Sequence, residues 1–305
     1  MDKSDSLLKE LYSKKALLII NPVSGKKLVI KFIPSIIRQL MEAGYLVTTM
    51  ITSRRGEATS IAAQLGADYD LVCCTGGDGT LNEAVSGLAE KGIAVPLGYI
   101  PCGSTNDFAS SRALSMDIEK AAGRAAAGSV RRFDVGRFGE HYFTYVAAFG
   151  AFSWLSYTTD QNLKNMLGYS AYIIDAIFSA YKVKPIHIRF RDGESVHEDD
   201  YIFGAICNST SVAGKIELSR DLVDMNDGLF EVLLIKMPKT IIELDAIIRG
   251  LLAQDYSSPL IDFFQTDSLD IDNPTDLEWS LDGECAVGDD SVHFSVMRGF
   301  LELQS

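Results

Sequence analysis

The sequence has few of the residue types that mark secreted, metal-binding or membrane-spanning proteins. Its 305 residues include five cysteines, an odd number without any C-x-x-C pair, which argues against a disulfide framework or a cysteine zinc site. Four histidines are scattered along the chain, and none is paired at helical spacing, so a histidine metal site has little support. No apolar run reaches the roughly 18 to 20 residues that cross a bilayer, and the N-terminus lacks the apolar core of a signal peptide. We therefore expect a cytoplasmic protein.

Positive charge is also scarce. The chain has 28 Lys and Arg against 41 Asp and Glu, a net charge of -13, which makes nucleic-acid binding improbable because a phosphate backbone requires a positive field. The charge is uneven, however, with seven lysines and three acids over residues 1–31, and ten acids without Lys or Arg over residues 262–290. A solvated surface explains both stretches, and the basic stretch has the alternative of contact with an anionic membrane surface.

Short apolar runs and helical patterns alternate in the first half. Strands are predicted at 16–20, 45–51, 71–75 and 96–100, with helices within 28–43, at 57–66 and from residue 80. This order predicts an α/β domain with a parallel sheet and helices on both faces. The loops "NPVSGK" at 21, "TGGDGT" at 75 and "PCGSTND" at 101 each follow a predicted strand. In a parallel sheet they would meet at one edge, where ligands bind in such folds.

After about residue 130 the pattern changes. Alternating runs such as "HIRFR" and "SVHFSV", separated by turn signals, predict a mostly antiparallel β-sandwich domain. Helices are expected at about 169–182 and 240–254. We place the first domain at 1–133 and the second at 134–297, with residues 298–305 returning to the first.

The loop at 75–80 has the composition of a phosphate cradle. A strand leading into Gly-Gly-Asp-Gly-Thr and then a helix presents backbone N–H groups at a helix N-terminus, where an anion is favoured. By itself it is explained equally well as a tight turn with Thr80 as the N-cap. Asp78 favours the phosphate hypothesis, because a carboxylate beside a phosphate requires a divalent cation between them.

Four motifs in this order resemble the soluble bacterial diacylglycerol kinase and lipid kinase family, which is related to sphingosine kinases and, more distantly, to NAD kinases. They are "NPVSGK", "TGGDGTLNEAVSGL", "PCGSTNDFA" and "LDGE" at 281–284. The resemblance implies a kinase with ATP as co-substrate and Mg²⁺ as cofactor, transferring the γ-phosphoryl group to a lipid hydroxyl. The positions that match its nucleotide site are Asn21, Gly25, Lys26, Thr52, Gly76, Gly77, Asp78, Gly79, Thr80, Leu81, Asn82 and Ser104, where Ser104 replaces the usual Thr.

Two further features take their roles from the resemblance. "DLVDMNDGLF" at 221–230 matches the family's structural Mg²⁺ loop, with Asp224, Asp227 and the Leu229 carbonyl as ligands. The bare pattern fits an Asn-Asp-Gly hairpin turn equally well. Asp-Gly-Glu occurs twice, at 192–194 and 282–284, and the pattern alone does not choose between them. The resemblance selects Glu284 as the general base, with Asp78 supporting Mg²⁺, and leaves 192–194 as a hairpin tip.

The sequence therefore predicts an ATP- and Mg²⁺-dependent lipid kinase acting on diacylglycerol or a related lipid alcohol. It would touch the inner membrane surface transiently and weakly, through the basic N-terminal stretch and Lys182 with Lys184; a homodimer is left open. The alternatives are a kinase of a soluble alcohol, such as NAD or a sugar phosphate, and a non-catalytic nucleotide or lipid sensor. Intact Asp78 and Glu284 speak against the sensor.

Overall fold

The computed structural model describes residues 12–27, 29–150, 185–212, 216–219, 221–239, 241–272, 277–287 and 290–305. The chain divides into two compact units. Unit 1 comprises Met1–Val135 and Arg298–Ser305, and unit 2 comprises Gly136–Met297. The two stretches that join the units run through β5 (Val130–Phe138) and β17 (Ser291–Gln304). The helix expected at 169–182, with Lys182 and Lys184, lies outside the described residues.

Unit 1 is built on a parallel sheet. Its strands are β1 (Lys14–Ile20), β2 (Tyr45–Ile51), β3 (Leu71–Gly76) and β4 (Leu97–Pro101), in the order β4-β3-β1-β2. The C-terminal end of β17 adds a further parallel strand beside β4, through the pairs Leu303↔Leu97 and Gln304↔Gly98. Residues 71–76 of β3 are buried throughout, as expected for a strand covered on both faces.

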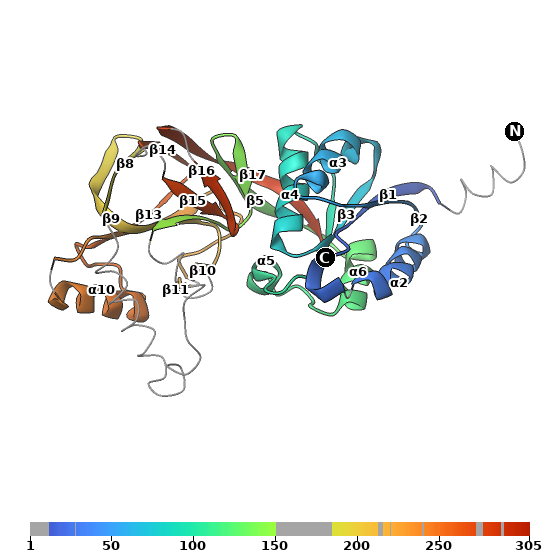
Figure 1. The fold of residues 1–305 in the computed structure, drawn as a ribbon, viewed down its shortest axis with the longest axis horizontal. Coiled ribbons are helices and arrows are strands. Elements are labelled where there is room, and N and C mark those ends of the chain that lie inside the picture. Colours follow the sequence, from blue (N-terminus) through green and yellow to red (C-terminus); the bar gives the residue numbers. More distant parts are fainter. Residues whose placement is uncertain are drawn as a thin grey trace, which may run out of the picture. The chain divides into compact units, whose positions relative to one another are not determined.

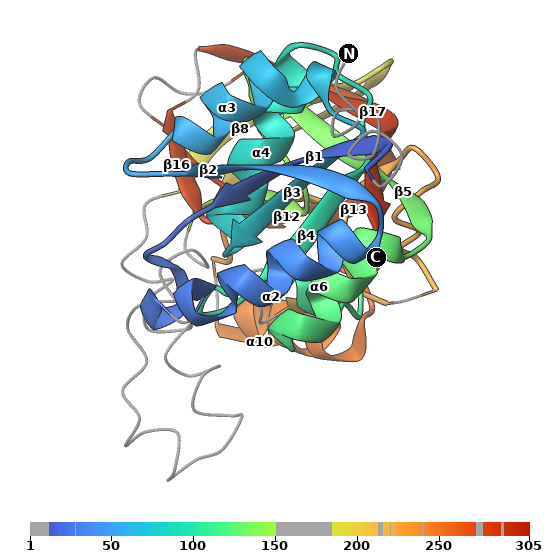
Figure 2. The ribbon, with the colours of Figure 1, turned by 90° about the vertical axis from the view of Figure 1, so that its right-hand side faces the viewer.

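Helices cover both faces of this sheet. Figure 2 shows α3 (Glu57–Leu65) and α4 (Asp78–Glu90) on one face and α2 (Val29–Glu42) and α6 (Ile118–Ala127) on the other. The buried residues of α2 and α6 form one core with alternate residues of β1 and β3, including Leu18, Ile36, Cys73 and Ala122. Shorter elements are η1 (Ser24–Lys27), η2 (Gly66–Asp68) and α5 (Asp107–Ser111).

Unit 2 is made mainly of antiparallel strands. The central strand is β9 (Ser195–Cys207), which pairs with β7 (Val146–Gly150), β8 (Ile186–Asp192) and β12 (Phe230–Lys236). Strands β15 (Glu278–Leu281) and β16 (Glu284–Val287) form a hairpin (Figure 1), and β15 also pairs with β7. The other elements are β6 (His141–Phe143), β10 (Ser211–Val212), β11 (Ile216–Glu217), β13 (Ile261–Thr266), β14 (Ser268–Asp272) and α10 (Ile241–Ala253).

The core of unit 2 is rich in aromatic residues contributed by alternate positions of these strands. Phe149 and Trp279 lie with ring centroids 4.8 Å apart, and Phe138 lies 4.7 Å from the same tryptophan. The prediction of an α/β domain followed by a mostly antiparallel β-rich domain is confirmed. In the part of the chain that the structure describes, no helix is long and apolar enough to span a membrane.

Candidate active site

The loops after β1, β3 and β4 meet at one edge of the unit 1 sheet. The backbone N–H of Asn21 donates to the Thr75 carbonyl at 3.0 Å, and that of Cys102 donates to the Gly76 carbonyl at 2.8 Å. After β2, the Thr52 N–H donates to the Ile20 carbonyl at 2.9 Å. The prediction that the three glycine-containing loops converge is therefore confirmed, since all of them follow the carboxyl ends of parallel strands.

Glycine allows these loops to touch backbone to backbone. Gly25 has φ +51°, and a Cβ added to it would lie 1.9 Å from the carbonyl oxygen of Cys102. A Cβ added to Gly103 would lie 2.4 Å from the Gly77 Cα. The sequence explains the glycines of these loops by the approach of a phosphate. Contact between the loops themselves also requires glycine at these positions.

Helix α4 begins within the Gly-Gly-Asp-Gly-Thr motif, two residues earlier than predicted. Gly77, with extended backbone, occupies the N-cap position, so Asp78 and Gly79 lie in the first turn. The alternative with Thr80 as the N-cap is thus wrong. The Thr80 hydroxyl instead accepts a hydrogen bond from the Asn21 amide at 2.9 Å. The first turn of α4 faces the edge where the loops meet, as a cradle for an anion requires.

The Asp78 carboxylate links this helix to the third loop. One oxygen accepts the Asp107 N–H at 2.9 Å and the other accepts the Phe108 N–H at 3.1 Å. These donors are the first residues of α5, so the carboxylate also lies where a helix N-terminus favours negative charge. Backbone N–H groups thus compensate part of the Asp78 charge, and the sequence did not predict this contact.

Asp107 is a candidate that sequence reasoning missed, although it lies in the quoted "PCGSTND" motif. Its side chain is half-buried, and desolvation, with a smaller contribution from the Asp78 charge, raises the pKa of its carboxyl. Asn106 orders the same loop, since its side-chain oxygen accepts the Gly103 N–H at 2.8 Å. Two neighbouring carboxylates beside a helix N-terminus are an arrangement suited to a divalent cation bound with phosphate.

Glu83 in α4 secures the loop that follows β2. Its carboxylate accepts the N–H of Gly56 at 2.9 Å and that of Ala58 at 3.2 Å, at the N-terminus of α3. This loop includes Thr52, which is 8% exposed and whose hydroxyl donates to the Ile20 carbonyl. The fourth loop of the edge is therefore held by the same helix that carries Asp78.

The remaining predicted nucleotide positions differ in exposure. Leu81 is fully buried, and its backbone N–H donates to the Gly77 carbonyl at 3.1 Å. Asn82 is half-buried and its side-chain oxygen accepts a hydrogen bond from Ser86, whereas Ser104 is exposed. Of Lys26 only the backbone, in η1, is described. Unit 1 thus brings the predicted nucleotide positions to one sheet edge.

The predicted metal loop lies in unit 2, directly before β12. One Asp224 oxygen accepts the Asn226 N–H at 3.1 Å, and one Asp227 oxygen accepts the Leu229 N–H at 2.9 Å. Strand β12 pairs with β9 and β13, whereas β11 pairs with β10, so this turn does not join two strands paired with each other. The hairpin alternative is therefore wrong. Among the described residues, no group of three or more His, Cys, Asp or Glu is placed to hold a metal.

Glu231 lies two residues after this loop and was not singled out from sequence. The residue is completely buried; one carboxyl oxygen accepts a hydrogen bond from Gln265 at 3.0 Å, and the other has no hydrogen-bond partner among the described residues. Burial, with smaller contributions from Asp227 and Asp224, raises the pKa of its carboxyl to about 7. This buried oxygen lacks a donor and lies near two acidic side chains. A hydrated cation would supply both a water molecule that donates to it and a positive charge.

Both Asp-Gly-Glu sequences form two-residue hairpin turns. Asp192 pairs with Ser195 at the end of the β8–β9 hairpin, which confirms the predicted hairpin tip. Glu284 pairs with Leu281 at the end of the β15–β16 hairpin and is half-buried. It opens β16, so its backbone is fixed by the ladder while its side chain is partly accessible.

Comparisons with known proteins agree with this organisation. A family model described as the diacylglycerol kinase catalytic domain matches residues 15–138. A diacylglycerol kinase of Staphylococcus saprophyticus is 32% identical over 273 residues, which cover 89% of each chain. One from Bacillus subtilis is 30% identical over 275 residues, covering 89% of this chain and 90% of that protein. The crystal structure of a Bacillus anthracis diacylglycerol kinase superposes with a TM-score of 0.76 at 23% identity, over 95% of both chains.

The fold and the converging loops define a protein of the lipid kinase class, with an α/β unit and a β-rich unit. The chain belongs to the diacylglycerol kinase family.

Proposed function

We propose that this protein is an ATP- and Mg²⁺-dependent kinase that phosphorylates diacylglycerol or a related lipid alcohol. The observation that carries the proposal is the convergence of the loops after β1, β3 and β4 around the first turn of α4. Its relatives are named diacylglycerol kinases, which supports the acceptor class.

The nucleotide would be held in unit 1. The first turn of α4, with Gly76, Gly77 and Gly79, offers backbone N–H groups to the phosphates. Asn21, Thr80 and the loop at Gly25 form the adjoining wall, and Thr52, Ser104 and Lys26 complete the proposed set. Asp78 retains lone pairs beyond those used by Asp107 and Phe108, and Asp107 adds a second carboxylate. Together they suit the Mg²⁺ that accompanies a triphosphate.

A second cation would be held by the loop at 224–229 in unit 2. Asp224, Asp227 and the Leu229 carbonyl are hard oxygen donors of the kind that Mg²⁺ prefers. The buried Glu231 oxygen without a partner supports the fit, because a water molecule on the cation would donate to it. When bound, the cation would rigidify the turn before β12.

Glu284 would act as the general base. In the proposed step the lipid hydroxyl oxygen bonds to the γ-phosphorus, and the bond from that phosphorus to the β–γ bridging oxygen breaks. ADP leaves with the electron pair, and the hydroxyl proton passes to the Glu284 carboxylate. Such a base contributes about 10² to 10⁴ fold, and positioning with charge neutralisation supplies most of the remainder.

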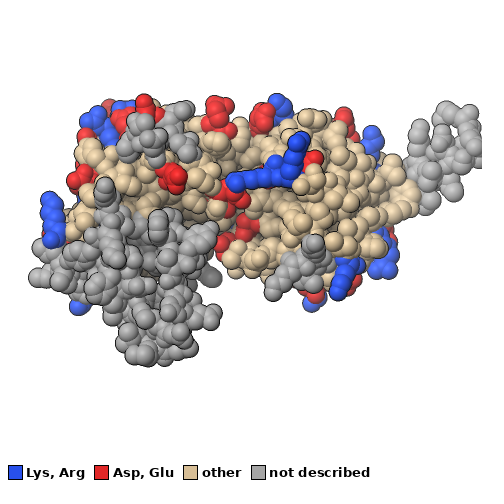
Figure 3. All heavy atoms as spheres, viewed as in Figure 1, with Lys and Arg blue, Asp and Glu red and all other residues tan. Residues whose placement is uncertain are grey.

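Membrane contact would be weak and sensitive to salt. The net charge of -13 opposes an anionic surface, whereas the lysines of residues 1–31 attract one locally. On the described part of the face in Figure 3, acidic and basic side chains are scattered, and neither sign forms a large patch. Binding to anionic vesicles that is strong and indifferent to salt would contradict this part of the proposal.

The experiment compares E284Q with E194Q, which makes the same change in the other Asp-Gly-Glu turn. Purified variants receive Mg²⁺ and labelled ATP with diacylglycerol micelles, NAD and a sugar phosphate as competing acceptors. We expect a phosphorylated lipid as the product. The rate of its formation should fall about 10² to 10⁴ fold in E284Q and stay unchanged in E194Q. A soluble phosphorylated product would favour the soluble-alcohol kinase. Nucleotide binding without transfer to any acceptor would favour the sensor.

A further inference from the structure

The two Asp-Gly-Glu turns share a tripeptide but differ in how the aspartate is used. In the β8–β9 hairpin, Asp192 is half-buried at the strand end, and one of its oxygens accepts a hydrogen bond from Thr266 at 2.9 Å. In the β15–β16 hairpin, Asp282 occupies the turn itself with φ +50°, followed by Gly283 with φ +87°. Asp282 is nevertheless only 4% exposed. A turn residue is normally exposed, so its burial requires a reason.

The Asp282 carboxylate is buried against the start of β7. One oxygen accepts the Thr144 N–H at 2.6 Å and the Thr144 hydroxyl at 2.8 Å. The other oxygen accepts the N–H groups of Tyr145 and Val146, both at 3.0 Å. The Asp282 N–H donates in turn to the Val146 carbonyl at 2.8 Å. Four donors around one carboxylate compensate the cost of burying its charge, and such charge-assisted bonds are strong.

This arrangement extends the attachment of the hairpin beyond its ladder. Strand β15 pairs with β7 through Ser280↔Ala148 and Leu281↔Ala147, and the Asp282 side chain fastens the next residue, in the turn. Turns of this type form readily with glycine or asparagine at the first position. An aspartate with left-handed backbone and a buried carboxylate is not needed to form the turn. Its effect is to fix the turn to residues 144–146.

We propose that Asp282 is a positioning residue for Glu284, holding the β15–β16 turn against residues 144–146 so that the Glu284 carboxylate stands in one place. The inference rests on the proposed role of Glu284 as the base. Glu284 follows Gly283, where an added Cβ would meet no atom of the described residues within 4 Å. Beyond the strand ladder, the turn is therefore held by the hydrogen bonds of the Asp282 carboxylate. A base displaced by about 1 Å loses on the order of 10² fold in rate.

The test compares D282N with D192N, the matched change in the other turn, and adds T144V as a milder variant. Asparagine keeps the shape of Asp282 but turns an NH₂ group toward N–H donors. We expect D282N to lower kcat about 10- to 100-fold and leave KM for ATP within about twofold, because the nucleotide loops belong to unit 1. Thermal unfolding should remain cooperative, and amides 144–146 should exchange faster. T144V should lower kcat less, and D192N should not change it.

The outcomes separate this inference from the proposed function. If E284Q keeps its activity, the base assignment fails and this inference fails with it. If E284Q is inactive but folded D282N and T144V keep their kcat, only the positioning role is overturned. A fall in activity that matches the loss of folded protein, or a rise in KM for ATP at constant kcat, would likewise overturn it. Should D282N fail to fold, T144V alone decides by the same criteria.

Discussion

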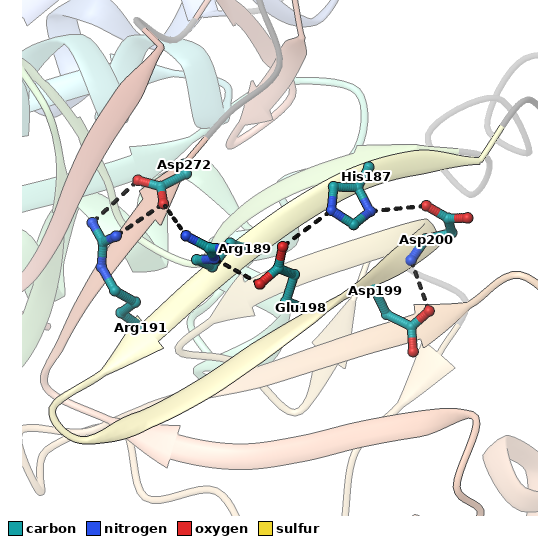
Figure 4. A network of polar contacts seen from close by, with 7 residues as sticks. All are labelled: His187, Arg189, Arg191, Glu198, Asp199, Asp200 and Asp272. Carbon is teal, nitrogen blue, oxygen red and sulfur yellow. Dashed lines mark hydrogen bonds and ion pairs between the residues drawn. The ribbon is translucent and has the colours of Figure 1, made fainter.

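His187 of β8 lies between two carboxylates of β9 in the β8–β9 hairpin. His187 Nδ1 lies 3.0 Å from an Asp200 oxygen and Nε2 lies 3.2 Å from a Glu198 oxygen (Figure 4). The same Glu198 accepts a hydrogen bond from Arg189 at 2.7 Å, and Asp272 accepts one from Arg191. All of these side chains are substantially exposed, so their net contribution to folding is small and falls with added salt.

We predict that the pKa of His187 lies above its ordinary value of 6.5. The hydrogen bond to Asp200 makes the larger contribution and that to Glu198 the smaller, because both favour the charged ring. Its stabilising contribution is therefore fully present below pH 6.5 and is lost as the pH rises through the folded-state pKa. NMR titration of the imidazole checks this. D200N should lower the pKa, whereas D199N, which changes the neighbouring residue of β9, should leave it unaltered. An equal response to both changes would contradict the pairing.

Individual residues show where sequence reasoning stops. Asp107 lies inside a motif that was recognised, but its proximity to Asp78 depends on α5 meeting α4. Glu231 occurs in "LFEVLL", which resembles any half-buried strand, and its side-chain partner Gln265 is 34 positions away in the sequence. The second Asp-Gly-Glu is distinguished from the first by contacts with residues 138 positions away in the sequence. None of these is a local property, so no pattern of spacing reveals them.

At the scale of elements, the local signals predicted the fold class of each unit, although α4 begins two residues before its predicted start. Fully apolar runs predicted parallel strands, and alternating runs predicted antiparallel ones, because burial on two faces or on one imposes those patterns. From the strand order it followed that the glycine-containing loops meet. What could not be predicted was why each glycine is there, since packing between the loops explains Gly25 and Gly103 as directly as a ligand does.

Contact between these loops predicts a specific sensitivity. G25A places a Cβ against the Cys102 carbonyl oxygen and strains φ +51°. The loop after β1 must then move away from the loop after β4, and we expect KM for ATP to rise at least about tenfold, with stability lower by about 1 to 3 kcal/mol. The control is G92A, which has φ +61° but no atom within 4 Å of the added Cβ. G92A should cost some stability without changing KM.

At the scale of the whole molecule, the proposed sites divide between the units. The nucleotide loops belong to unit 1 and the loop at 224–229 to unit 2, and each unit has its own core. The chain joins them through β5 and β17, so unit 1 combines two segments from distant parts of the sequence, whereas unit 2 is one continuous segment. Ligands that bind different units should therefore leave separate signatures in the full chain.

We predict that Mg²⁺ alone slows amide exchange at residues 224–231, and that adding ATP slows exchange at 21–27, 76–82 and 103–106. A ligand at about 100 times its Kd stabilises the state that binds it by about 2.7 kcal/mol, enough to slow locally opening amides about 100-fold. D227N should abolish the first effect and keep the second, because it removes one proposed cation ligand and leaves unit 1 unchanged. If Mg²⁺ without nucleotide protects the unit 1 loops and leaves 224–231 unaffected, the metal assignment in unit 2 is wrong.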